Sequence, residues 1–194
     1  YQRGYVWGKK REGTKDSVSF MLDTLMEGYG TDETEDQDRK DIFVQGITVV
    51  PSEDGADNKY IVIDGQQRTT FFYLLLKTLG DDKIITIIYN SSRGASATDV
   101  SPQLWLNNFS SKTDCTENIS EPTQDVYFFK KTVRLIKEHV LFKANHEKLI
   151  TYIRKHVRFL LIPIPASLAV STFTMMNGNK AIMADYELIK ADLL

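Results

Sequence analysis

The stretch Tyr60-Ile-Val-Ile-Asp64-Gly65-Gln66-Gln67-Arg68-Thr69-Thr70 decides most of what this sequence says about its fold. Its apolar start predicts a strand that ends at Ile63, and its last residues predict the opening of a helix. Backbone N–H groups at a helix start, together with the helix dipole, form a ready site for an anion. Gly65 lets the backbone approach a ligand closely, and Arg68 adds a two-pronged donor suited to phosphate. The stretch therefore predicts a phosphate site at a strand–turn–helix junction.

The other polar side chains of this turn fit the same chemistry. Asp64 is suited to hold a divalent ion or orient water. Gln66 and Gln67 are suited to direct water or to read a sugar or a base. A second interpretation stays open, because Asp64 and Gln67 stand three residues apart, as in a helix capping box. On that interpretation both side chains only satisfy the helix start, and Arg68 is a surface charge.

Outside this turn, the hydrophobic pattern predicts strands interspersed with helices. Ile42–Val50 and Lys59–Ile63 resemble a hairpin with a long polar loop, and further strands are predicted at Ile84–Tyr89 and Arg158–Ile164. Helices are predicted at residues 16–29, 69–79, 124–140, 147–156, 167–176 and 186–194. Because the first two strands are adjacent, the order favours an α+β fold with a mixed sheet over a doubly wound one.

The composition is that of an ordinary globular chain. The sequence has 194 residues, of which 42% are hydrophobic and 26% charged, with a net charge of −2. These values predict one domain and exclude a wholly disordered chain. The longest apolar stretch, Phe159–Val170, is too short and too rich in proline to cross a bilayer. A single cysteine, Cys115, and the absence of a signal-peptide pattern predict a cytoplasmic protein.

Two more clusters stand out. Tyr1-Gln2-Arg3-Gly4-Tyr5-Val6-Trp7 interleaves aromatic rings with polar donors, a pattern that can grip phosphates or pack on the domain. We favour packing for Tyr5 and Trp7. The second cluster runs from Phe173 through the Asn177-Gly178 turn to a helix that contains Glu187 and Lys190.

A basic stretch between Lys130 and Arg158 carries nine Lys and Arg against two Glu. Such a stretch can be a nucleic-acid face. We favour the alternative, in which it is a solvated helix surface that balances the acidic segment 31–41.

Taken together, the three clusters resemble the N-terminal domain of GmrSD-type restriction endonucleases, a bacterial family. The resemblance rests on the Tyr1-Gln2-Arg3 motif, the Asp64-Gly-Gln-Gln-Arg68 turn, and Asn177 followed by Glu187-Leu-Ile-Lys190-Ala. It implies a ParB/sulfiredoxin-like fold that binds and hydrolyses a nucleoside triphosphate with Mg²⁺. It also implies coupling to DNA and to a separate nuclease domain beyond this chain, in phage defence.

The resemblance also implies which residues line the nucleotide site. Its catalytic residues would be Asp64, Gln66, Gln67 and Arg68, with Asp64 also the metal ligand. The nucleotide-binding residues would be Gly65, Thr69, Tyr1, Gln2, Arg3, Asn177 and Lys190. The sequence Asn177-Gly178-Asn179-Lys180 departs from the family's usual Asn-x-Arg-Gly, and Thr69 replaces a usual Leu.

We expect one fold in two parts: an α+β core over residues 1–123, which contains the Asp64–Arg68 turn, and a mostly helical part with one strand over residues 124–194. Two other functions remain open beside the nucleotide hydrolase. The chain would be a non-catalytic module that senses nucleotide or DNA, or a ParB-like nuclease that acts on phosphodiesters directly.

Overall fold

A computed structural model describes residues 4–9, 13–52, 59–81, 83, 85–89, 101–113 and 123–178. Backbone contacts divide the chain into two units that interleave along the sequence. Unit 1 contains Tyr1, Gln45–Gln66 and Leu160–Leu194, and unit 2 contains Gln2–Val44 and Gln67–Phe159. The predicted division at residue 123 stays a prediction.

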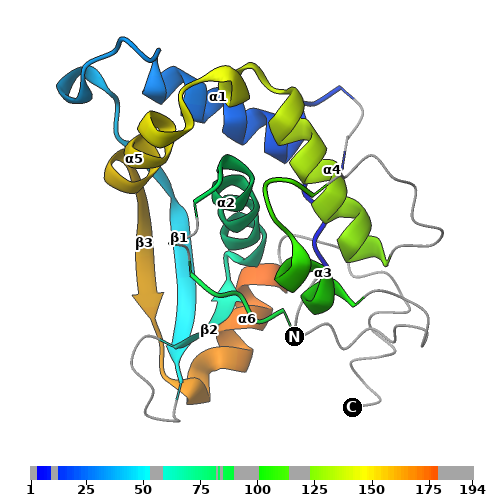
Figure 1. Cartoon of the computed structure of the whole chain (residues 1–194). Coiled ribbons are helices and arrows are strands. Elements are labelled where there is room, and N and C mark those ends of the chain that lie inside the picture. Colours follow the sequence, from blue (N-terminus) through cyan, green and yellow to red (C-terminus); the bar gives the residue numbers. More distant parts are fainter. Residues whose placement is uncertain are drawn as a thin grey trace. The chain divides into compact units, whose positions relative to one another are not determined.

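The sheet has three strands, β1 (Ile42–Pro51), β2 (Tyr60–Asp64) and β3 (Val157–Pro163), in the order β2-β1-β3 (Figure 1). β1 and β2 pair antiparallel, with Val50 opposite Ile61 and a register shift between Thr48 and Val49. The predicted hairpin is therefore confirmed, and so is the α+β class with its mixed sheet. The ParB/sulfiredoxin-like fold stays a prediction.

Unit 2 holds most of the helices and two apolar cores. The first core lies among α1 (Ser17–Tyr29), α2 (Gln66–Leu79), η2 (Val140–Lys143) and α5 (His146–His156). Asp16 caps the start of α1, because its carboxylate accepts from the backbone N–H groups of Val18 and Ser19. Leu22, Phe71 and Leu149 are fully buried there.

The second core of unit 2 is built from aromatic rings. It lies among α2, α3 (Pro102–Asn108) and α4 (Gln124–Glu138). Phe129 is fully buried, with its ring centroid 5.2 Å from that of Tyr5 and 5.5 Å from that of Trp105. The Trp7 ring lies 5.4 Å from that of Phe71. The packing role predicted for Tyr5 and Trp7 is confirmed.

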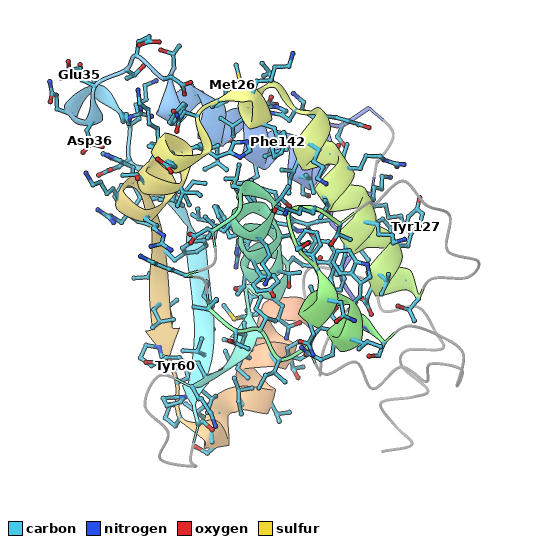
Figure 2. The ribbon with its side chains drawn as sticks, in the orientation of Figure 1. Met26, Glu35, Asp36, Tyr60, Tyr127 and Phe142 are labelled. Atoms are coloured by element: carbon cyan, nitrogen blue, oxygen red, sulfur yellow. The ribbon has the colours of Figure 1, made fainter. Side chains whose placement is uncertain are left out.

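The basic residues of α5 are balanced by the acidic segment that follows α1. Lys155 donates to Asp36 at 2.9 Å, and His156 lies 2.8 Å from Asp41. Lys148 Nζ donates to the backbone carbonyl of Asp32 at 2.7 Å. Figure 2 labels Glu35 and Asp36 on this segment. For α5, these contacts support the interpretation of the basic stretch as a solvated, charge-balanced surface.

The strand predicted at Ile84–Tyr89 is wrong for its described residues, which form neither strand nor helix. The reason is that a side chain takes the place of a neighbouring strand. The Gln103 side chain donates from Nε2 to the carbonyl of Ile87 at 3.2 Å, and its Oε1 accepts from the Tyr89 N–H. Ile84 lies outside the described residues.

In unit 1, the helix α6 (Ala169–Gly178) lies against β2 after a short 3-10 helix, η3 (Ala166–Leu168). The predicted helix at 167–176 is thus confirmed with bounds shifted by two residues. The backbone N–H of Ile164 donates to the carbonyl of Val49 at 2.9 Å. Within the described residues, no helix has the length and apolarity needed to cross a membrane.

Candidate functional site

The junction between β2 and α2 is a tight turn made by one glycine. β2 ends at Asp64 and α2 begins at Gln66, so Gly65 alone links them. Its φ of +97° lies in the left-handed region, which other residues adopt only with strain. Gly65 is buried, whereas Asp64, Gln66, Gln67, Arg68 and Thr69 are all half-buried. Polar residues therefore stand on both sides of Gly65 along the chain, as the sequence predicts.

The part of the turn in unit 1 is held by Gln66. Its Nε2 donates to the backbone carbonyl of Val62 at 3.1 Å, four residues back on β2. This bond ties the first residue of α2 to the end of the strand. α2 begins at Gln66, three residues before the predicted start.

The part of the turn in unit 2 is bound to the N-terminal segment. The Gln67 side chain donates from Nε2 to the carbonyl of Gly4 at 2.9 Å, and its Oε1 accepts from the N–H of Val6 at 2.9 Å. In a capping box, this side chain would reach back to the Asp64 backbone instead. Its amide is engaged with residues 4 and 6, so the capping-box interpretation does not describe Gln67.

Tyr5, between those two residues, is held by three further side chains. Its backbone N–H donates to the carboxylate of Asp125 and to the hydroxyl of Tyr89, the latter at 3.1 Å. Its hydroxyl lies 3.0 Å from the Thr132 hydroxyl. Burial raises the pKa of Tyr5 far above its usual value, so this hydroxyl stays protonated.

Arg68 and Thr69 lie in the first turn of α2. The Nε atom of Arg68 is buried, and the first turn of the helix holds no acidic residue. A cation at the positive end of a helix dipole is electrostatically unfavourable, whereas an anion bound there is favourable. The electrostatics of this helix start therefore suit an anion.

The remaining predicted site residues are not all described. Tyr1, Gln2, Arg3 and Lys190 lie outside the described residues, and Asn177 lies near the end of α6 with no description of its side chain. Gly4, which follows Arg3 directly, is the residue that Gln67 binds. Two of the three sequence clusters therefore meet, through Gln67, in unit 2.

Sequence analysis missed Asp125, Tyr89 and Gln103. Asp125 is 3% exposed and accepts from both the Tyr5 N–H and the Tyr89 hydroxyl, at 2.9 Å for the hydroxyl. An Asp in the first turn of a helix is ordinarily a surface residue that favours the dipole. The signal that it is buried is the apolar residue on its C-terminal side, Val126, together with Phe129 one turn on.

Comparison with known protein families identifies the family of this chain. The model of the GmrSD restriction endonuclease N-terminal domain matches residues 1–194. The chain belongs to this family. No curated protein and no solved structure matches it. As a GmrSD N-terminal domain, the chain is part of a restriction-type defence protein. Membership is consistent with DNA and a nuclease domain as partners in the full protein.

Proposed function

We propose that this GmrSD N-terminal domain binds a nucleoside triphosphate with Mg²⁺ and hydrolyses it. The hydrolysis would be coupled to recognition of foreign or modified DNA and to cutting by a separate nuclease domain. The reaction would take place in the cytoplasm, where the protein would encounter foreign DNA that has entered the cell. The observation that carries the proposal is the Asp64–Arg68 turn at the start of α2, whose Gln67 binds Gly4 and Val6 of the N-terminal segment.

The proposed roles follow from charge and geometry. Arg68 and the backbone N–H groups at the start of α2 would stabilise the phosphate oxygens, with Arg3 as a second cation. Phosphoryl transfer depends mainly on positioning and on stabilisation of charge, for which such a set is suited. Gln66 or Gln67 would orient the attacking water. Tyr1, Gln2, Thr69, Asn177 and Lys190 are proposed to contact the nucleotide.

The donor set also fits the proposed metal. The described residues contain no group of three or more His, Cys, Asp or Glu that could hold an ion. Mg²⁺ ordinarily needs only one or two carboxylates, because substrate phosphates and water supply its other ligands. Asp64, half-buried at the end of β2, would be that carboxylate. The metal would neutralise phosphate charge when bound.

The test is calorimetric titration with each nucleoside triphosphate and Mg²⁺, followed by an assay of phosphate release. Arg68→Ala should abolish binding while the protein stays folded. The matched control is Arg134→Ala, which removes an exposed arginine from α4. Full turnover by Arg68→Ala would show that the residue is wrongly assigned. Binding without phosphate release would favour a sensing module, and metal-dependent nicking of plasmid DNA by this chain alone would favour a ParB-like nuclease.

A further inference from the structure

Gln67 uses its side-chain amide as a substitute for a peptide group. The Gln67 amide donates to the carbonyl of Gly4 and accepts from the N–H of Val6. These two backbone groups belong to residues i and i+2 of one segment. Gln103 binds Ile87 and Tyr89 in the same i and i+2 pattern. Each glutamine is the second residue of its helix, α2 or α3. Both segments are therefore held by helix starts rather than by strands.

The two held segments also meet each other. The Tyr89 hydroxyl accepts from the Tyr5 N–H and donates to Asp125, whose carboxylate also accepts from the Tyr5 N–H. A carboxylate that is 3% exposed is costly to bury, and these donors offset that cost. We call Gln67, Tyr89 and Asp125, with their bonds to Gly4–Val6, the N-terminal clamp.

The clamp fixes the chain at the point where the first motif ends. Arg3 is one peptide bond from Gly4, whose carbonyl is held by Gln67. Gln67 in turn is the neighbour of Arg68 on α2. Consecutive side chains of a helix point about 100° apart. Gln67 can therefore bind Gly4–Val6 while Arg68, the next residue, faces a ligand. The amide atoms of Gln67 are engaged with protein backbone, which suits a supporting role.

We propose that Gln67 and Asp125 are positioning residues: they hold the Gly4–Val6 segment, and nucleotide affinity depends on them through Arg3, the residue before that segment, rather than through contacts of their own with the nucleotide. This inference rests on the proposed function. It reassigns the work of Gln67 from contact with the reacting water to alignment of the two motifs, and it adds Asp125 and Tyr89 to the residues on which the site depends.

The clamp itself is tested by amide hydrogen exchange, which needs no nucleotide. Gln67→Met removes both bonds to the segment with little change in size, so exchange at the Val6 N–H should quicken about tenfold. The matched control is Arg154→Met, which puts the same residue elsewhere in unit 2, where Arg154 binds Asp81. Exchange at Val6 that is unchanged in Gln67→Met, or quickened equally by the control, would overturn the clamp.

The role of the clamp in binding is tested by a double-mutant cycle with Arg3→Ala. Nucleotide affinity should fall about tenfold in Gln67→Met but less than twofold when Gln67→Met is added to Arg3→Ala. Asp125→Asn keeps an acceptor for the Tyr5 N–H but loses the charge. It should lower nucleotide affinity by less than Gln67→Met does, and this loss should also shrink when Arg3→Ala is present. A structural defect or a direct contact by Gln67 would instead give losses that add.

The outcomes separate the two proposals. Nucleotide binding with additive losses overturns the positioning role and leaves the proposed function standing. A wild-type protein that binds no nucleotide, but whose Val6 exchange depends on Gln67, overturns the proposed function and with it the positioning role. Binding with non-additive losses and faster exchange at Val6 supports both.

Discussion

The described parts of the two units differ in how many of their apolar side chains they bury. Unit 2 encloses two cores, with fully buried residues on α1, α2, α4 and α5. In the described part of unit 1, Val49 and Val50 are the buried apolar residues. Eight large apolar side chains of that unit are exposed: Tyr60, Ile61, Leu160, Leu161, Ile162, Leu168, Val170 and Met175. Tyr60 is labelled in Figure 2.

The contrast occurs even within one strand. On β3, Val157 is 7% exposed and belongs to the first core of unit 2, whereas Leu160, three residues on, is 66% exposed. Both are apolar residues of the same strand. Composition therefore predicts the strand along its whole length, but burial depends on whether another element lies over each face.

The largest effect is expected from Phe129→Ala in the aromatic core of unit 2. The variant empties a site lined by Tyr5, Tyr89 and Trp105, and we expect a loss of about 3–5 kcal/mol in the free energy of unfolding. Urea denaturation at neutral pH measures it. A loss below about 1 kcal/mol would mean that this cluster is not a core on which the fold depends.

Arg154→Met should have the next largest effect. Arg154 donates three hydrogen bonds to the carboxylate of Asp81, which is 7% exposed, and a further one to the carbonyl of Lys83. Its removal leaves a buried carboxylate without its cation, so we expect a loss of about 1–3 kcal/mol by urea denaturation. Arg154→Met/Asp81→Asn is the control and should recover part of that loss. A double variant less stable than Arg154→Met would contradict this account.

A smaller, pH-dependent effect is expected from Asp36→Asn. Hydrogen bonds from Lys155 and then His156 lower the pKa of Asp36 below its usual 3.8. A lowered folded pKa contributes stability that is present above the unfolded pKa and lost as pH falls through the folded one. Wild-type stability should therefore decline more steeply below about pH 4 than that of the variant.

This pH dependence is measured by urea unfolding at a series of pH values from neutral to strongly acidic. Asp38→Asn is the matched control, because Asp38 is an exposed carboxylate of the same segment. If the control flattens the acid branch as much as Asp36→Asn does, the ion pairs with α5 are not the cause.

The smallest effect on stability is expected from Leu160→Ser in unit 1. Leu160 is two-thirds exposed, so the free energy of unfolding should change by no more than about 0.5 kcal/mol. Binding of a hydrophobic dye should fall, because the variant removes apolar surface. A loss above about 2 kcal/mol would show that this face is covered in solution, and the contrast between the units would then disappear.

Much of the fold could be predicted from local pattern. The hairpin and the helices at 16–29, 124–140 and 147–156 follow from periodicity and end residues, with helix bounds shifted by up to two residues. The segment that ends at Tyr89 was predicted wrongly as a strand. Its β-branched residues favour extended backbone, but its hydrogen bonds go to Gln103, a residue that no strand pattern points to.

The position of the candidate site in the sequence could be predicted, but the hydrogen-bond partners of its residues could not. The Asp64–Arg68 turn has a glycine at the one position that needs positive φ, so local sequence was sufficient. The partners of Gln67 lie 63 and 61 residues away, and a glutamine at a helix start has several uses. Asp125 was missed because burial of its carboxylate depends on Tyr5, which is 120 residues away.

The N-terminal clamp also fixes an order of events during synthesis. Gly4–Val6 leave the ribosome early, yet their partners are spread along the chain at Gln67, Tyr89, Asp125 and Thr132. Contacts between residues so far apart in the sequence form slowly, because the loop between them must close first. Gly4–Val6 are made before all four partners, so they cannot complete their contacts until α4 has been translated.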